Sequence, residues 1–193
     1  MEEVVLDLVR CARCGLRFVN PRPTQDALLS LCSEDLFEDP LYWSGALETG
    51  TYFDKNIERR QVYYHKVATD FHTIISKHKE PSGTLLDVGC ACGLLMKELG
   101  ELGWRTYGVE VSDSAAAFAR EQLGLDVATG TLMGAHFPDK EFDLIIAKDV
   151  LEHGSRNEES SERLERLVSS DTGEREAKRI LPGSTLNRST KPR

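Results

Sequence analysis

One short stretch in the middle of this 193-residue chain constrains its fold most strongly: LLDVGCACG, residues 85–93. The apolar residues that open it are typical of a strand covered on both faces, and a leucine-rich segment of helical character follows. Between them the chain turns through glycine, alanine and cysteine, which let the backbone approach a ligand closely. A helix that starts there offers N–H groups to a polar or negative group. This order predicts a ligand-binding α/β unit, with a tight turn that binds nothing as the simpler alternative.

The segments around this turn alternate between strand and helix patterns. Strands are expected at 84–88, 105–111, 125–129 and 142–147, and helices at 94–102 and 113–123. Ser112 is a suitable N-cap for the second of these helices, and Gly124 suits its C-terminal end. Helices of this length between strands favour right-handed crossovers and a mainly parallel sheet. The sequence therefore predicts the α/β class.

A further helix is expected upstream, at about 55–79. Apolar side chains recur there at helical spacing, namely Tyr63, Val67, Phe71 and Ile74. This spacing predicts one buried face that includes Tyr63.

Charge and cysteine usage exclude several classes of protein. The 32 acidic residues outnumber the 24 basic ones, which gives a net charge of −8 and argues against nucleic-acid or membrane-surface binding. No apolar run approaches the ~18 residues of a membrane span, and no secretory signal is apparent at the start. Five cysteines, an odd number, indicate a reducing compartment rather than a disulfide framework. We expect a cytoplasmic protein.

The turn departs from the dinucleotide-binding fingerprint, which has small residues at its first, third and sixth positions. Counted from Gly89, these positions hold Gly89, Ala91 and Leu94, so the sixth fails. Glu110 ends the second strand, where a carboxylate can accept hydrogen bonds from a ribose diol and would repel a 2′-phosphate. An NAD(P)-binding domain is therefore a disfavoured alternative.

Four motifs occur in order along the chain. They are DVGCACG at 87–93, GVEVS at 108–112, the segment 130–143, and FDLIIAKDVLEH at 142–153. Together they resemble the successive motifs of class I S-adenosylmethionine (SAM)-dependent methyltransferases, over about residues 9–153. The resemblance implies a Rossmann-like sheet in the strand order 3-2-1-4-5-7-6, with SAM at the switch between strands 1 and 4.

The resemblance also implies roles for individual residues. The methionine part of SAM would contact Asp87 and the backbone of Gly89, Cys90, Ala91 and Gly93. The ribose would contact Glu110. The adenine would contact Val111, Leu132 and Met133. Within the turn, we expect Cys90 and Cys92 to be small space-filling residues.

The acceptor is expected to be a small molecule above the carboxyl ends of the strands. The sulfonium already activates the methyl group, so the protein mainly aligns the reactants and sometimes supplies a base. His153 is the first candidate base because it titrates near neutrality, with Asp149 and Glu152 as alternates. The alternative is that Glu152 and His153 only orient the turn. Further candidates for the acceptor pocket are His136, Tyr52, Tyr63 and Tyr64.

The N-terminal segment resembles one knuckle of a zinc ribbon, as in the nearest branch of the family. Cys11 and Cys14 supply one pair of ligands, whereas structural zinc usually takes four. Cys32 alone does not complete the set. The two cysteines are thus a half-site for zinc or, alternatively, a pair in a surface turn.

Three regions are expected: an irregular N-terminal segment (1–53), a SAM-binding domain (54–153) and a polar, disordered or divergent tail (154–193) with a surface helix at 158–169. No strand is apparent in the tail, so the sheet appears truncated after its fourth strand. Residues 142–147 would then form an exposed edge that promotes self-association or binding of a partner chain.

The sequence thus predicts a SAM-dependent methyltransferase of small molecules. The main alternative is a catalytically incompetent SAM-binding remnant, or a subunit of a complete methyltransferase. A nucleic-acid-binding zinc module is the most distant alternative.

Overall fold

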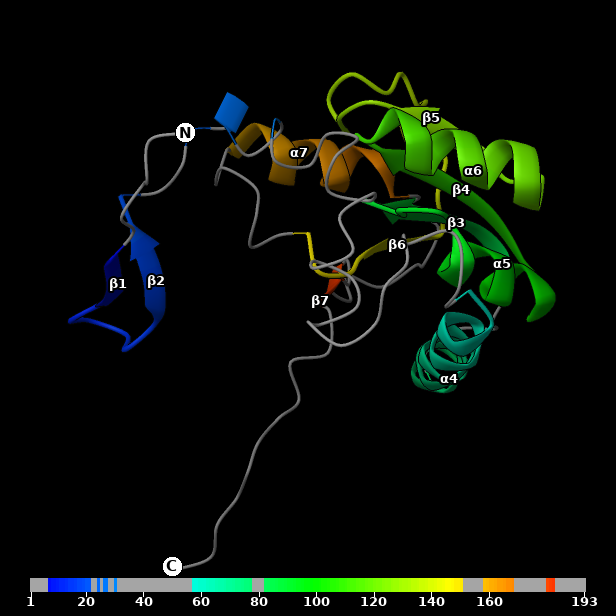
Figure 1. Ribbon diagram of the computed structural model, residues 1–193, viewed down its shortest axis with the longest axis horizontal. Coiled ribbons are helices and arrows are strands. Elements are labelled where there is room, and N and C mark those ends of the chain that lie inside the picture. The colour runs from blue at the N-terminus through cyan, green and yellow to red at the C-terminus, as the bar shows by residue number, and fades with distance from the viewer. Residues whose placement is uncertain are drawn as a thin grey trace, which may run out of the picture.

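The structure, a computed structural model, describes residues 7–21, 24, 26–27, 30, 57–77, 82–150, 158–168 and 180–182. These residues form two separate sheets. The smaller is an antiparallel hairpin of β1 (Asp7–Arg10) and β2 (Arg17–Asn20), which lies apart from the rest of the fold in Figure 1. None of the described helices combines the length and the apolar character needed to cross a membrane.

The larger sheet has five strands that pair in parallel throughout. In chain order they are β3 (Gly83–Val88), β4 (Trp104–Glu110), β5 (Asp126–Thr129), β6 (Leu144–Ala147) and β7 (Ile180–Pro182). Their spatial order is β5-β4-β3-β6-β7. The first four strands therefore take the expected 3-2-1-4 order, and the Rossmann-like α/β class is confirmed.

The predicted exposed edge at 142–147 is wrong, because β6 has a neighbour on each side. β3 flanks it on one side, and β7 pairs with it on the other through Ile145 with Ile180 and Ile146 with Leu181. The expectation that the tail supplies no strand was wrong for the same reason. Ile180 and Leu181 are an apolar pair in a polar region, too short a run to be recognised as a strand from its pattern.

Two helices cover one face of the sheet, α4 (Ile57–Ile75) and α5 (Leu94–Glu101). Figure 1 shows α4 beneath α5, on the side away from α7. Their buried side chains meet the sheet in one cluster: Val67, Ala68, Phe71, Ile75, Leu85, Leu95, Leu99, Trp104 and Ile146. This layer forms one of the two main clusters of the hydrophobic core.

The buried face of α4 contains Val67 and Phe71 as predicted, but its other members differ from the prediction. Tyr63 and Ile74 are 50% and 41% exposed, whereas Ala68 and Ile75 are buried and Tyr64 packs against the core. Both stripes satisfy helical spacing, so the choice between them depends on contacts with α5 and the sheet. Tyr63 is consequently a surface residue.

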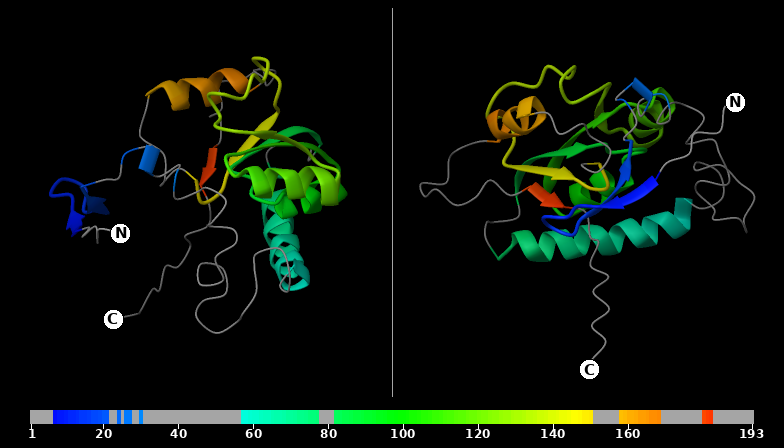
Figure 2. Two further views of the ribbon diagram at one scale, coloured as in Figure 1. Left: turned by 45° about the horizontal axis from the view of Figure 1, so that its top comes forward. Right: turned by 90° about the vertical axis from the view of Figure 1, so that its left-hand side faces the viewer.

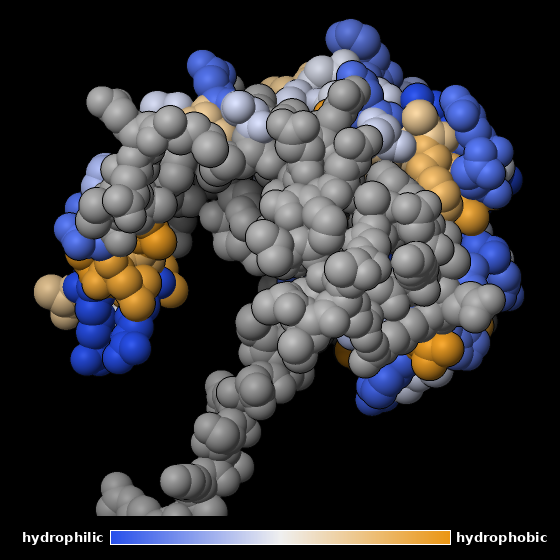
Figure 3. Space-filling model, in the orientation of Figure 1, coloured by the Kyte–Doolittle hydropathy of each residue, from blue (hydrophilic) through white to orange (hydrophobic). Residues whose placement is uncertain are grey.

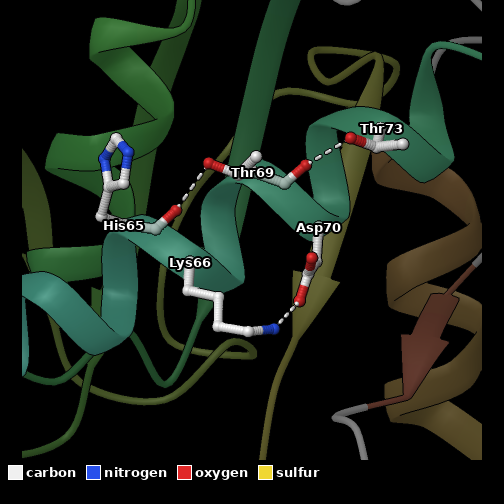
Figure 4. A network of polar contacts seen from close by, with 5 residues as sticks. All are labelled: His65, Lys66, Thr69, Asp70 and Thr73. Atoms are coloured by element: carbon white, nitrogen blue, oxygen red, sulfur yellow. Dashed lines mark hydrogen bonds and ion pairs between the residues drawn. The ribbon is translucent and has the colours of Figure 1, made fainter.

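The solvent-facing side of α4 is held by local polar contacts, which Figure 4 shows from close by. Lys66 forms an ion pair with Asp70 one turn later, at 2.8 Å, and the hydroxyl groups of Thr69 and Thr73 donate to carbonyl oxygens four residues earlier. His65 reaches across to α5, where its Nδ1 lies 2.8 Å from a carboxylate oxygen of Glu98. Among these contacts, the one between His65 and Glu98 links α4 to α5, and the others lie within α4.

The predicted bounds of α6 (Asp113–Leu123) are confirmed at both ends. The Ser112 hydroxyl accepts the N–H of Ala115 at 3.3 Å, and Gly124 adopts the left-handed conformation, φ 66°. Small side chains at Ala116 and Ala119 are fully buried, which lets the helix approach the sheet closely.

The last described helix, α7 (Glu158–Leu167), lies on the opposite side of the sheet from α4, as Figure 1 and Figure 2 show. A helix was predicted here, but as a surface element. Leu164 and Leu167 are 5% and 0% exposed and pack in the cluster around Phe142. One stripe of α7 is therefore part of the core. The boundaries of the three regions, 1–53, 54–153 and 154–193, remain a prediction.

Candidate functional site

The turn between β3 and α5 lies beside the point where the order of the strands reverses, between β3 and β6. Three of its residues have positive φ angles: Gly89 at 69°, Ala91 at 50° and Gly93 at 78°. A Cβ atom on Gly89 would collide with the side chain of Val150, so this glycine is sterically required. A left-handed conformation at a residue other than glycine costs on the order of 1–3 kcal/mol and is typical of functional sites. Ala91 carries such strain.

The carboxylate of Glu110 is directed at this turn. Its two oxygens accept hydrogen bonds from the N–H groups of Ala91, at 2.8 Å, and Ser112, at 2.9 Å. The residue is only 5% exposed. A carboxylate has about four lone-pair positions, so both oxygens retain capacity to accept from the hydroxyls of a ligand. The acid and the turn thus lie in direct contact, and their joint role in binding a ligand remains a prediction.

The N–H groups of the turn form hydrogen bonds within the protein. Gly89 donates to the carbonyl oxygen of Val109 at 2.8 Å, and Gly93 donates to that of Cys90 at 2.9 Å. These bonds hold the turn in its shape. No side chain caps the start of α5, so the first turn of that helix keeps the polarity expected of a helix N-terminus.

Two buried acids give the site its electrostatic character. Asp87 is 3% exposed, and burial, together with the nearby charge of Glu110, raises its pKa to about 7, opposed by the charge of Lys148. Burial also raises the pKa of Glu110, opposed by the N–H groups of Ser112 and Ala91. Two carboxyl groups kept out of water favour a ligand that carries positive charge.

The cysteines of the turn fill space, as predicted. Cys90 and Cys92 are 6% and 1% exposed, and Cys90 lies so close to Gly108 that a Cβ atom there would contact its sulfur. Burial raises the pKa of the Cys90 thiol, which keeps it protonated. A protonated, buried thiol is inert as a nucleophile or metal ligand.

The residues expected around the adenine lie next to the turn or in the loop between β5 and β6. Val111 and Leu132 are half-buried, and Leu132 packs against the cluster around Phe142. Met133 is 46% exposed, and His136 is also exposed. Val111 directly follows Glu110 in the sequence. Leu132 packs against the core, whereas the side chain of Met133 is exposed.

The carboxyl end of β6 holds a residue that the sequence analysis missed. Lys148 forms an ion pair with Asp149, and its side chain is only 12% exposed. Its ammonium nitrogen lies 5.8 Å from the centre of the Tyr63 ring. A lysine placed directly after an apolar strand, inside the fourth motif, was the available signal.

Other predicted residues fall outside the described part of the chain. These are Cys32, Tyr52, Glu152 and His153. Among the candidate bases, Asp149 is described; it has a positive φ of 55° and a side chain that is 59% exposed.

The predicted zinc half-site lies on the β1–β2 hairpin. Cys11 is half-buried and Cys14 is exposed, and the N–H groups of Cys14 and Arg13 lower the pKa of the Cys11 thiol. Within the described residues, no three His, Cys, Asp or Glu side chains gather as metal ligands. Cys11 and Cys14 therefore remain a pair without described further ligands.

Taken together, a parallel sheet in this order, a small-residue turn and an acid at the end of the adjacent strand define a Rossmann-like nucleoside-binding domain. Comparison with known proteins gives the family. Residues 86–172 match the family described as methyltransferase domain. Over these residues, the α/β domain of this chain matches the methyltransferase domain, and its strand order is that of class I SAM-dependent methyltransferases.

Individual relatives are similar over part of the chain. An "uncharacterized methyltransferase" of Anoxybacillus flavithermus is 28% identical over 103 residues, 52% of this chain and 49% of that protein. A ubiquinone biosynthesis O-methyltransferase of Bradyrhizobium diazoefficiens is 35% identical over 74 residues, 36% of this chain and 29% of that protein. The matched region thus spans about half the length of the first relative and less of the second.

A solved structure shares the fold. It is that of a candidate S-adenosyl-L-methionine-dependent methyltransferase from Methanococcus maripaludis, with a TM-score of 0.50 and 15% identity. The similarity covers 65% of this chain and 63% of that one.

Proposed function

We propose that this protein binds SAM at the β3–α5 turn and transfers its methyl group to a small-molecule acceptor. The observation that carries the proposal is the pair of hydrogen bonds from Ala91 and Ser112 to Glu110, which joins the acid to the turn. The buried carboxyl groups of Asp87 and Glu110 add support, because they favour a positively charged ligand such as a sulfonium.

The residues of this site fit the donor in kind and in place. Glu110 would accept from the ribose hydroxyls and Asp87 would face the amino group of the methionine part. The backbone of Gly89, Cys90, Ala91 and Gly93 would line the same part. Val111, Leu132 and Met133 would contact the adenine, with Met133 free to move over it because its side chain is exposed.

The protein would contribute mainly binding and alignment to the reaction. SAM supplies a methyl group already activated by its sulfonium. The chain would align an acceptor at the carboxyl end of β6 and limit the access of water. A base would be needed only for an acceptor that must lose a proton, and His153 is our first candidate, followed by Asp149 and Glu152.

The wider setting follows from composition. A net charge of −8 supports an acceptor other than nucleic acid. The described cysteines are free thiols, which supports a reducing compartment, and we propose the cytoplasm. The O-methyltransferase among the relatives supports an acceptor hydroxyl group.

Isothermal titration with S-adenosylhomocysteine tests the donor site. Glu110→Ala should weaken binding by ~1.5–3 kcal/mol, because hydrogen bonds to a charged group are lost. Glu101→Ala is the matched control, since Glu101 is exposed on α5, and should bind as the unchanged protein does. Equal affinity of Glu110→Ala would remove Glu110 from the site, and tighter binding of NADH than of S-adenosylhomocysteine would overturn the choice of ligand.

A further inference from the structure

Lys148 is a cation held at the carboxyl end of the sheet, close to the proposed donor site. Its side chain is 12% exposed, whereas that of its ion-pair partner Asp149 is 59% exposed. The partner is thus a surface carboxylate that can swing into water while the ammonium group stays in place. A carboxylate of a ligand can therefore replace Asp149 at the ammonium group of Lys148, because the displaced Asp149 carboxylate is solvated at the surface.

Helix α4 places two aromatic rings between this lysine and the donor turn. Tyr64 packs in the cluster that contains Ala91 and Leu94, and its ring meets that of Tyr63 edge to face, with 5.2 Å between ring centres. Tyr63 in turn lies under the ammonium group of Lys148. A series of contacts through Tyr64 and Tyr63 therefore links the donor turn to the lysine.

Tyr63 is unusual among the aromatic residues of the described fold because half of its surface is exposed. A ring in this position can stack with a planar ligand, which adds to the attraction between the ring and the cation.

The charge of Lys148 persists at neutral pH. Burial lowers the pKa of the ammonium group, but the hydrogen bond that it donates to Asp149 and the negative charge of that carboxylate outweigh this and leave the pKa above its usual value. The buried carboxyl of Asp87 faces the same region and is influenced by Lys148. The donor side of the site is therefore acidic, and the acceptor side carries the cation.

We propose that Lys148 and Tyr63 form the binding subsite for an acceptor that carries an aromatic ring and a carboxylate. The ring stacks on Tyr63 and the carboxylate replaces Asp149 at the ammonium group of Lys148. The assignment of this ligand as the methyl acceptor rests on the proposed function. Binding of an anion at Lys148 does not itself depend on methyl transfer. It adds a substrate class, aromatic carboxylic acids, to the proposed activity.

The test uses two minimal probes on the full chain. Benzoate has a ring and a carboxylate, whereas benzyl alcohol has the ring without the charge. Dissociation constants are measured by NMR titration in the presence of S-adenosylhomocysteine. We expect benzoate to bind at least tenfold more tightly than benzyl alcohol, Lys148→Met to reduce this ratio to about one, and Lys148→Arg to retain most of it.

Two further variants distinguish the specific effect of Lys148 from a general effect of net charge and from a loss of folding. Lys66→Met removes a lysine of α4 whose side chain is 75% exposed and should leave the ratio unchanged. Tyr63→Leu changes an exposed side chain and should weaken both probes at least threefold, whether or not Lys148→Met folds. Equal binding of the two probes, a preference that survives Lys148→Met, or unchanged affinities in Tyr63→Leu would each overturn the proposal.

Titration of S-adenosylhomocysteine alone keeps the two proposals apart. If Lys148→Met weakens that ligand and leaves the benzoate preference intact, Lys148 serves the donor and the acceptor subsite is refuted. If no variant binds S-adenosylhomocysteine but the benzoate preference depends on Lys148, the anion subsite stands and the proposed function falls.

Discussion

The guanidinium group of Arg163 on α7 donates to the carbonyl oxygen of Phe137 at 2.6 Å. The same side chain reaches Asp139 at 3.0 Å and the carbonyl oxygen of Ala135 at 3.4 Å. All three partners lie in the loop between β5 and β6, which also contains Leu132 and Met133. A helix from the polar C-terminal region thus holds the loop that we expect over the adenine.

Replacement of Arg163 should therefore affect both stability and donor binding. Arg163→Met leaves carbonyl oxygens without their donor, and we expect a loss of about 1–3 kcal/mol in the free energy of unfolding. Because the loop would no longer be fixed, S-adenosylhomocysteine should also bind more weakly. Urea unfolding and isothermal titration measure the two effects.

Arg166→Met is the control on the same helix. The Arg166 side chain is exposed, and it is the backbone oxygen of Arg166 that accepts the N–H of Lys140. This variant should resemble the unchanged protein in both measurements. Equal behaviour of Arg163→Met and Arg166→Met would show that the guanidinium contacts do not hold the loop.

Replacement of two glycines, one at each end of α5, by alanine should change the stability of the protein in opposite directions. Gly93 has a φ of 78°, and a Cβ atom there would collide with Leu125, so Gly93→Ala should destabilise the protein by about 1–3 kcal/mol. Gly100 lies within α5 with open space around it, so Gly100→Ala should stabilise by about 0.5–1 kcal/mol. Thermal unfolding of the two variants compares them directly, and changes of the same sign would contradict the assigned geometry.

Asp87 predicts a pH dependence of stability in the ligand-free protein. Its pKa is raised to about 7 in the folded state, so folding favours the protonated form. This contribution is fully present below the pKa of the unfolded chain, near 4, and is lost as the pH rises to 7. An asparagine side chain does not titrate, so Asp87→Asn should abolish this loss of stability. The change in the free energy of unfolding that the substitution causes should therefore be more favourable at pH 8 than at pH 4, by on the order of 2–4 kcal/mol.

Urea unfolding at several pH values between 4 and 8 tests this dependence. Asp126→Asn replaces an exposed aspartate of β5 and should leave the pH profile unchanged. Asp87→Asn should also weaken binding of S-adenosylhomocysteine, since the amino group loses its charged partner. Parallel pH profiles for Asp87→Asn and the unchanged protein would show that Asp87 is already ionised in the folded state.

Local signals in the sequence predicted the fold where a local cause decides the structure. Both ends of α6 follow from Ser112 and Gly124, which cap the helix through contacts within a few residues. The order of strands 1–4 came from the family resemblance and is confirmed. By contrast, the buried stripe of α4 depends on its contacts with α5, and β7 depends on pairing with β6, far away in the sequence. Neither could be predicted from periodicity alone.

The candidate site shows the same division. The position of Glu110 at the turn followed from its place at the end of a strand next to β3. Lys148 was missed because its burial and its contact with Tyr63 exist only after α4 has packed against the sheet. The internal partners of the N–H groups of the turn, such as the carbonyl oxygen of Val109, come from the adjacent strand, so they depend on the packing of the sheet.

The β1–β2 hairpin combines an exposed apolar surface with a positive charge. Figure 3 shows apolar surface on it, and four of its large apolar side chains are exposed: Leu8, Leu16, Phe18 and Val19. Its net charge is positive, with Arg10, Arg13 and Arg17 against Asp7, in a chain that is acidic as a whole.

The bonds from Ala91 and Ser112 to Glu110 also have a kinetic consequence. A turn that is already fastened need not be ordered by an arriving nucleoside, so its conformational entropy is lost when the chain folds and not when the ligand binds. Association should then occur in a single exponential phase whose rate grows linearly with ligand concentration, without a slow rearrangement afterwards.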